Sequence, residues 1–143
     1  MAGLIVLEPQ TDPFDEGVVR ASMGGIFSLQ LARATHDELC EWASDRRCSI
    51  VGMSPRGDTS YTAIDIRSPV VIFLGEERRG LTERELSICH STAGIPMRGH
   101  ADSLNIGVAA GVVLFDLLRR RGERPRLRRR QHKTKASEAV RAG

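Results

Sequence analysis

Cysteine is scarce in this sequence, and its few cysteines are not arranged in pairs. Cys40, Cys48 and Cys89 are an odd number and show no C-x-x-C spacing. Disulfide-dependent secreted domains carry a denser, even set, and structural zinc sites need closely spaced ligands. The histidines show no metal-ligand spacing either. The sequence therefore predicts reduced thiols in a cytosolic setting, with no disulfide framework and no bound metal.

Long apolar runs are also absent. No stretch of about eighteen apolar residues occurs, which argues against a transmembrane helix. The first residues, MAGLIVLEPQ, contain a short apolar segment but lack the basic region that begins a signal peptide. This segment is typical of a buried strand. We therefore expect a cytoplasmic protein with no membrane partner.

Aromatic residues are few, at 4% of the chain, although 41% of the residues are hydrophobic. The core must therefore consist mainly of Val, Ile, Leu and Ala. A length of 143 residues suits one compact domain. We expect that domain to span residues 1–122 and to be followed by a tail, residues 123–143, which has too few apolar residues to fold.

Acidic residues are nearly missing from one stretch close to the C-terminus. Residues 119–130 read RRRGERPRLRRR, and the net charge of +3 hides this asymmetry. Such a basic run is typical of nucleic-acid affinity through phosphate contacts, and Arg119 and Arg120 at its start are candidate RNA-binding residues. A disordered, solubilising tail is an equal alternative.

Two short apolar runs in the middle of the chain each end in a polar loop with glycines. Residues 70–74, VVIFL, precede the loop 75–80, and residues 94–97, GIPM, precede the loop 98–103. In parallel α/β sheets, such loops lie at the carboxyl ends of strands, where ligands bind. Apolar runs alternate with helical patterns along the chain, which predicts an α/β fold with a mostly parallel sheet. We expect the two loops to lie side by side at a binding site.

Two capping boxes mark helix starts, THDE at 35–38 and TERE at 82–85. They predict helices that end near residues 46 and 90, the first with Leu39, Trp42 and Ala43 on one face. Residues 14–21 predict another short helix, residues 26–31 a weak strand, and residues 48–53 a further strand.

The last helix is expected to begin at a cap formed by Asp102 or Ser103 and to end near Arg121. One apolar face follows its helical period. The residues on that face are Leu104, Val108, Val112, Phe115 and Leu118.

The middle of the chain resembles the SpoU/TrmH family of RNA methyltransferases in two motifs. Residues 73–82, FLGEERRGLT, resemble the second motif of that family. Residues 95–99, IPMRG, followed by residues 103–109, SLNIGVA, resemble the third. The segment DP…VVRASMG at residues 12–24 is similar to a further family segment. Two motifs in the family's order and at its separation are far more specific than one glycine-rich loop.

The resemblance implies the trefoil-knotted fold of the SPOUT superfamily, S-adenosylmethionine as cofactor, and methyl transfer to an RNA ribose 2′-oxygen. Both tRNA and rRNA stay open as substrates. The resemblance also implies a homodimer, because SPOUT relatives are dimers whose active sites lie near the interface. In such an enzyme the cofactor carries the activated methyl group, and the protein supplies binding and orientation.

Carried over residue by residue, the family's glutamate falls on Glu77 and its asparagine on Asn105, and we expect both to be catalytic residues. The positions that match cofactor-binding residues are Leu74, Gly75, Ile95, Met97, Ser103 and Leu104. Arg78 and Arg79 either contact RNA phosphate or are ordinary exposed arginines. As alternatives, Glu77 is a solvated loop acid and Asn105 only caps a helix.

The sequence also departs from the family. Glu76 stands where the family has a small polar residue, and Gly107 stands where it has serine. The first motif of the family, N-x-G-x-x-x-R, supplies the catalytic arginine and does not occur in this sequence. The resemblance therefore covers roughly residues 3–121 and omits the front of the family's domain.

Two functions are compatible with this pattern. The first is an RNA 2′-O-methyltransferase that obtains its arginine from a partner or from an upstream segment. The second is a catalytically inactive remnant of the same fold that binds the cofactor or RNA.

Overall fold

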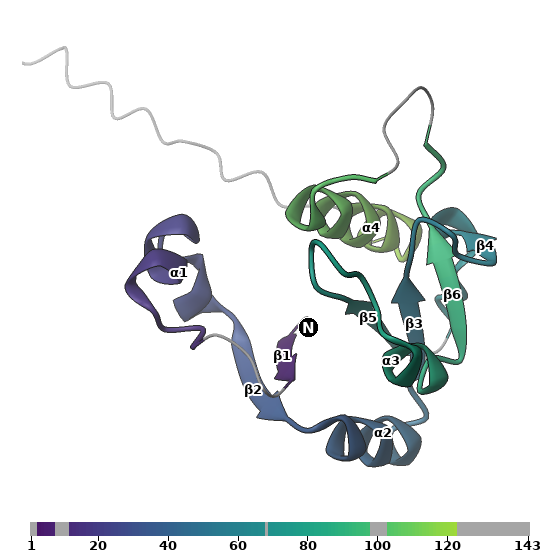
Figure 1. Cartoon of the computed structure of the whole chain (residues 1–143), viewed down its shortest axis with the longest axis horizontal. Coiled ribbons are helices and arrows are strands. Elements are labelled where there is room, and N and C mark those ends of the chain that lie inside the picture. Colours follow the sequence, from purple (N-terminus) through teal and green to yellow (C-terminus); the bar gives the residue numbers. More distant parts are fainter. Residues whose placement is uncertain (1–2, 8–11, 68, 98–102, 123–143) are drawn as a thin grey trace, which may run out of the picture.

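The computed structural model describes residues 3–7, 12–67, 69–97 and 103–122, in which strands and helices alternate (Figure 1). The elements are β1 (Gly3–Leu7), α1 (Glu16–Ala21), η1 (Gly25–Ser28), β2 (Gln30–Ala34), α2 (His36–Asp45), β3 (Ser49–Met53), β4 (Thr59–Ser60), η2 (Tyr61–Ala63), β5 (Val70–Leu74), α3 (Glu83–Ser87), β6 (Ser91–Gly94) and α4 (Ile106–Arg120), where η marks a short 3-10 turn. Every pairing between these strands is parallel. The predicted α/β class with a mostly parallel sheet is therefore confirmed. No helix in the described ranges is long and apolar enough to cross a membrane.

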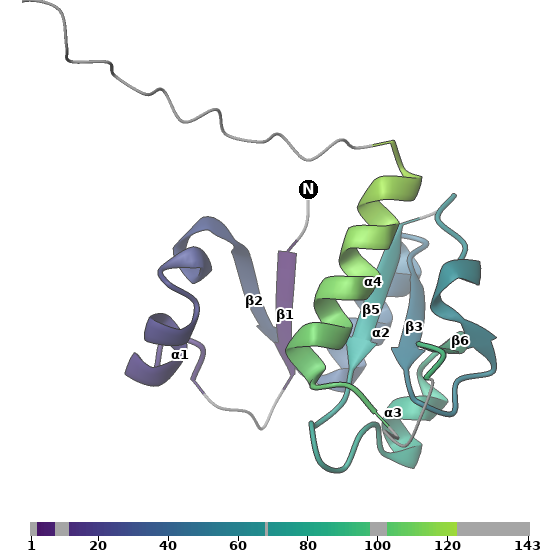
Figure 2. The same cartoon turned by 90° about the horizontal axis from the view of Figure 1, so that it is seen from above.

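The strands form two separate sheets. The larger has the order β4-β6-β3-β5, and β1 pairs only with β2. Figures 1 and 2 show the β1–β2 pair set apart from the larger sheet. Within the described residues, β1 and β5 therefore each have one edge without a partner strand. Ile5 and Leu7 of β1 are nevertheless partly buried against the core of the larger sheet.

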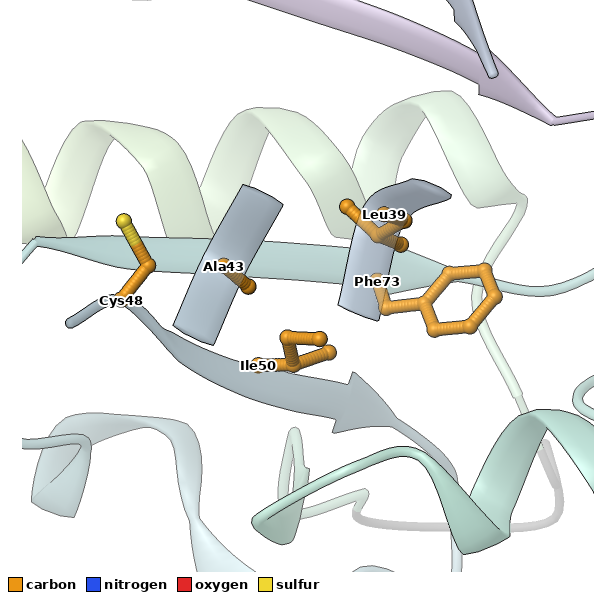
Figure 3. Packing of buried hydrophobic residues seen from close by; sticks show 5 residues of the cluster. All are labelled: Leu39, Ala43, Cys48, Ile50 and Phe73. Atoms are coloured by element: carbon orange, nitrogen blue, oxygen red, sulfur yellow. The ribbon is translucent and has the colours of Figure 1, made fainter. Parts of the chain in front are cut away.

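The core consists of two apolar clusters, one on each face of the larger sheet. Side chains alternate between the faces of a strand, so the neighbours Ile50 and Val51 of β3 belong to different clusters. The α2-side cluster, shown in Figure 3, contains Leu39, Ala43, Cys48, Ile50 and Phe73. The α4-side cluster contains Val51, Ile64, Ala93, Val113 and Leu117. Helix α4 thus covers the face opposite α2 and α3 (Figure 1).

The two predicted capping boxes are present. The hydroxyl oxygens of Thr35 and Thr82 each accept from the backbone N–H of the glutamate three residues on, and the backbone N–H of each threonine donates to the carboxylate of that glutamate. The predicted apolar face of α2 is only partly right. Leu39 and Ala43 are buried, but Trp42 is 43% exposed. Leu39 and Ala43, four residues apart, pack into the core, whereas Trp42 lies to one side of the line that they form along the helix.

Two predicted strands are displaced. Residues 25–28 form a 3-10 turn instead of a strand because Gly24, with φ 78°, turns the backbone into the left-handed region, and β2 begins only at Gln30. The strand predicted over 94–97 is β6, which ends at Gly94. Pro96 lies just beyond it and has no N–H to donate to a ladder.

Helix α4 buries a different face from the one predicted. The expected apolar face, Leu104, Val108, Val112, Phe115 and Leu118, is exposed, with Phe115 at 59%. The buried side carries Val113, Asp116 and Leu117. Its N-cap is Asn105, so the predicted cap at Asp102 or Ser103 is wrong. The helix is apolar on several sides, and its period alone does not select the side that meets the sheet.

The buried side of α4 is tied to η2 by a network centred on Asp116. The Asp116 carboxylate accepts from Arg119 Nη2 at 2.7 Å and from Arg120 Nε at 2.8 Å. Arg120 also donates to the carbonyl oxygens of Ile64 at 2.9 Å and Tyr61 at 3.4 Å. The hydrogen bond from Arg119, followed by the contact with Arg120, lowers the pKa of Asp116 below its ordinary value of 3.8. Arg120 thereby helps fix the end of α4 to the η2 segment.

This network predicts a pH-dependent contribution to stability. A carboxylate whose folded-state pKa is depressed stabilises the fold above the ordinary pKa, and this contribution is lost as the pH falls through the folded-state value. Asp116→Asn should therefore lower the midpoint of thermal unfolding at pH 7, and the difference from wild type should shrink below about pH 4.

Circular dichroism melts between pH 7 and pH 3 measure this difference, with Glu41→Gln on the exposed side of α2 as the control. A difference between Asp116→Asn and wild type that stays constant with pH would contradict the electrostatic explanation.

Candidate functional site

The carboxyl ends of three neighbouring strands are brought level by their parallel register. Met53 at the end of β3 lies opposite Leu74 of β5 and Ala93 of β6. The segments that follow these strands therefore leave the sheet at one edge, where the N-terminus of α4 also lies. Together they enclose a pocket of about 250 Å³. A cavity therefore lies at the carboxyl ends of the strands, where the sequence predicts a binding site.

All six residues predicted to bind a cofactor line this pocket. They are Leu74, Gly75, Ile95, Met97, Ser103 and Leu104. Glu77, Arg78 and Arg79 also line it. Gly99, which was expected in the second loop, lies outside the described residues. The loop after β5, Ser103 and the start of α4 therefore share one cavity.

Sequence reasoning missed the contribution of β3 and of α4 itself. Met53, Ser54, Pro55, Ile106 and Ala109 also line the pocket, as do Glu76 and Gly80 of the loop after β5. The polar loop after β3 follows the same rule that identified the other two loops, namely an apolar strand that ends in turn-forming residues. That rule was sufficient to find Ser54 and Pro55. To predict that Ile106 and Ala109 line the pocket, it would have been necessary to know which face of α4 is buried.

The loop after β5 closes on itself, and its glycines are required by that closure. Glu76 and Gly80 exchange two backbone hydrogen bonds, of 3.2 and 2.7 Å. A Cβ atom on Gly75 would lie 2.3 Å from the Gly80 carbonyl carbon, which is too close for any side chain. Gly80 has a φ of +69°, a conformation that L-residues rarely adopt. Gly75 and Gly80 therefore shape the pocket wall whether or not a ligand touches them.

Asn105 joins this loop to α4. Its side-chain oxygen accepts from the backbone N–H groups of Gly107 at 3.0 Å and Val108 at 3.3 Å, which caps the helix. Its amide nitrogen donates to Glu77 Oε1 at 2.5 Å. Asn105 therefore caps α4, and the same side chain also binds the glutamate of the other motif, while the catalytic role expected of Asn105 stays a prediction. The Glu77 carboxylate is thus held near the positive end of the helix dipole.

The four arginines predicted to bind RNA fall in two places. Arg78 and Arg79 are exposed at the pocket, and Arg79 Nε lies 3.4 Å from Glu76 Oε2. Arg119 and Arg120 lie at the far end of α4, about 22 Å from Asn105 at 1.5 Å per residue. Arg120 has a structural role in the Asp116 network, and its contact with RNA stays a prediction.

The chemistry that these side chains offer is binding and positioning. No cluster of histidine, cysteine and acidic residues in the described part of the chain is suited to a metal ion. The Asn105 amide has no basicity with which to accept a proton. The Glu77 carboxylate is engaged by Asn105. The pocket combines apolar walls from Leu74, Ile95 and Met97 with closely approached backbone, which suits a ligand with a planar ring and a polar chain.

Comparisons with known proteins agree with this geometry. The model of the SpoU rRNA Methylase family matches residues 1–115. A 23S rRNA (uridine(2479)-2′-O)-methyltransferase from Streptomyces viridochromogenes is 34% identical over 125 residues, which are 83% of this chain and 44% of that protein. An uncharacterized tRNA/rRNA methyltransferase from Mycobacterium avium is 39% identical over 104 residues, 71% of this chain and 33% of that protein.

Solved structures show the same fold. The SpoU methyltransferase AviRb from Streptomyces viridochromogenes, in complex with AdoMet, superposes with a TM-score of 0.78 and is 33% identical. The match covers 85% of this chain and 51% of the AviRb chain. An AdoMet-bound rRNA methyltransferase from Sinorhizobium meliloti superposes with a TM-score of 0.76 and is 35% identical. The match covers 82% of this chain and 46% of that protein. The chain therefore spans about half or less of the length of these relatives. With a family match that extends over most of its length, the chain belongs to the SpoU methyltransferase family.

Proposed function

We propose that the pocket binds S-adenosylmethionine and that the complete protein transfers its methyl group to a ribose 2′-oxygen of RNA. The observation that carries this proposal is the convergence of two family motifs on one cavity at the carboxyl ends of β3, β5 and β6. AdoMet-bound relatives with the same fold support it. The relative that methylates 23S rRNA favours rRNA over tRNA as the substrate.

Each part of the pocket has a task in this function. S-adenosylmethionine, when bound, supplies a methyl group activated by its sulfonium. Leu74, Ile95 and Met97 would hold the adenosine by apolar contact, and the closed loop at Gly75 would offer backbone groups to its polar edge. Glu77 and Asn105 fix the relative position of the two motifs. Alignment of the ribose hydroxyl with the methyl carbon contributes up to about 7–11 kcal/mol in favourable cases.

The proton of the ribose hydroxyl requires a further group. Neither Glu77 nor Asn105 is suited to accept it, for the reasons given above. In the family this work belongs to the arginine of the first motif, and N-x-G-x-x-x-R is absent from these residues. We therefore propose that the chain as given methylates RNA poorly or not at all. The two alternatives differ in whether that group is supplied: the enzyme obtains it from a partner or an upstream segment, and the inactive remnant lacks it.

A homodimer is part of the proposal. The outward face of α4 carries the exposed apolar side chains Leu104, Val108, Val112, Leu114, Phe115 and Leu118. An apolar face of this size on a folded protein usually marks an interface. A second copy suits it because Leu104, at one end of this face, also lines the pocket, so that pairing through α4 puts both pockets near the interface. The cytoplasmic location, the absence of a metal, the knot and the boundary at residue 122 stay predictions.

Cofactor binding is tested by filling the pocket. Ser103→Trp should reduce the affinity for S-adenosylmethionine at least about tenfold, or about 1.4 kcal/mol, because the indole occupies space that the ligand needs. Ser103 is exposed, so the fold should tolerate the change, whereas any substitution at Gly75 disturbs the loop itself. Isothermal titration calorimetry measures the affinity, and Ser44→Trp on α2 is the control. Wild-type protein that releases no heat with the cofactor would refute the proposal.

The missing arginine is tested by adding it. A chain extended upstream with a segment that carries N-x-G-x-x-x-R should transfer methyl groups to bulk RNA about 10²–10⁴-fold faster than the chain as given, the usual contribution of one acid–base group. Transfer of radioactive methyl groups from the cofactor to rRNA and tRNA measures both rates. Equal, robust activity would mean that another residue has taken over, and Arg20 would be the first to replace by alanine.

The dimer is tested on the outward face of α4. The double substitution Val108→Glu and Phe115→Glu puts two charges on the proposed interface and should shift the protein to monomer in sedimentation velocity at micromolar concentration. Leu86→Glu on α3 is the control, because Leu86 is exposed but lies away from α4. A wild-type protein that sediments only as monomer would count against this interface.

A further inference from the structure

The loop between β3 and β4 carries an exposed arginine on a rigid support beside the pocket. Ser54 N–H donates to the Ala93 carbonyl at 3.0 Å, and Gly57 N–H donates back to the Ser54 carbonyl at 3.0 Å. A Cβ atom on Gly57 would lie 2.4 Å from the Ala93 carbonyl carbon, so the loop backbone rests directly on β6. Arg56 lies in this turn, next to Pro55, which lines the pocket.

Arg78 lines the same cavity from another loop. It belongs to the loop closed by the Glu76–Gly80 backbone pair, and it lines the pocket. Like Arg56, it is exposed. The loop of Arg56 rests on β6 and the loop of Arg78 follows β5, and these two strands flank β3 on opposite sides.

The acids on these two loops are already engaged. Glu76 pairs with Arg79 at 3.4 Å, and Glu77 accepts from Asn105 at 2.5 Å. The Asp58 carboxylate accepts from the Thr92 hydroxyl at 2.7 Å. By contrast, no ion pair within the described residues engages Arg56 or Arg78. Both guanidinium groups can therefore bind an external anion without breaking an internal pair.

We propose that Arg56 and Arg78 form a two-point clamp for the phosphates that flank the target nucleotide of an RNA strand. Guanidinium groups match phosphate oxygens through paired N–H donors. Two such groups on separate loops at the same edge of the sheet suit a chain with repeated phosphates whose intervening ribose lies over the cavity. This assignment rests on the RNA methyltransferase function proposed above, and it adds Arg56, on a loop outside both family motifs, to the substrate site.

The salt dependence of RNA binding tests the clamp. Each phosphate contact contributes about 0.7 to the slope of log affinity against log salt for a single strand. Arg56→Ala and Arg78→Ala should each reduce the slope by about that amount, and the double variant by about twice as much. Arg56→Lys keeps the charge and should retain most of the slope. Fluorescence anisotropy with a labelled single-stranded oligoribonucleotide gives the slopes.

Arg46→Ala is the matched control. Arg46 is exposed and follows α2 at the opposite, amino-terminal edge of the sheet, and its replacement removes the same charge. The arginine-rich segment is present in all variants and does not affect the comparison. Thermal melts show whether each variant is folded. A slope for Arg56→Ala equal to that of Arg46→Ala would overturn the clamp.

Calorimetry with S-adenosylmethionine separates the clamp from the function on which it rests. The clamp predicts that Arg56→Ala leaves cofactor affinity unchanged. Loss of cofactor affinity in this variant would instead place Arg56 against the methionine carboxylate and overturn its assignment to RNA. Failure of the wild type to bind cofactor would refute the proposed function, while the anisotropy slopes would still report on phosphate contacts.

Discussion

The site depends on one geometric constraint, the register that holds the carboxyl ends of β3, β5 and β6 level. Met53 pairs with both Leu74 and Ala93, so three chain segments leave the sheet together. The backbone is then fixed at short range in two of these segments, after β5 by Gly75 against Gly80 and after β3 by Gly57 against Ala93. A slip of one residue in either pairing would turn every side chain of that strand to the other face and remove the pocket. The pocket therefore requires both the strand register and the glycines that allow the close backbone contacts.

Asn105 shows how one residue serves both the fold and the site. Its oxygen satisfies backbone donors at the start of α4, and its nitrogen binds Glu77 in the other motif. The orientation of the amide follows from this arrangement, because only the oxygen accepts hydrogen bonds from N–H groups. Capping of the helix therefore does not exclude the catalytic role that the family resemblance implies for Asn105. The helix start and the position of the glutamate are set by the same side chain.

Much of this arrangement follows from local sequence rules. The strand ends before Gly75 and Ser54 and the caps at Thr35 and Thr82 are local consequences of turn and capping chemistry, whereas the residues that line the pocket were predicted from the family resemblance. What the sequence could not supply depends on tertiary contacts. Helix α4 is apolar on several sides, and the sheet selects Val113 and Leu117 rather than Val108 and Phe115. The network of Arg120 with Asp116 and the carbonyl of Ile64 joins residues more than fifty positions apart, which no periodicity indicates.

Open strand edges, among them those of β1 and β5, also affect the behaviour of the chain in solution. β1 and β5 present unpaired N–H and C=O groups, and an open edge is a template for pairing with another strand. Intermolecular pairing at these edges would produce open-ended association rather than a closed pair of subunits, because β1 and β5 are different surfaces. It would compete with assembly through α4 and would be insensitive to charges placed on that helix. Self-association of this chain at high concentration would then have two independent origins, the proposed pairing of two copies through α4 and the pairing of strands at open sheet edges.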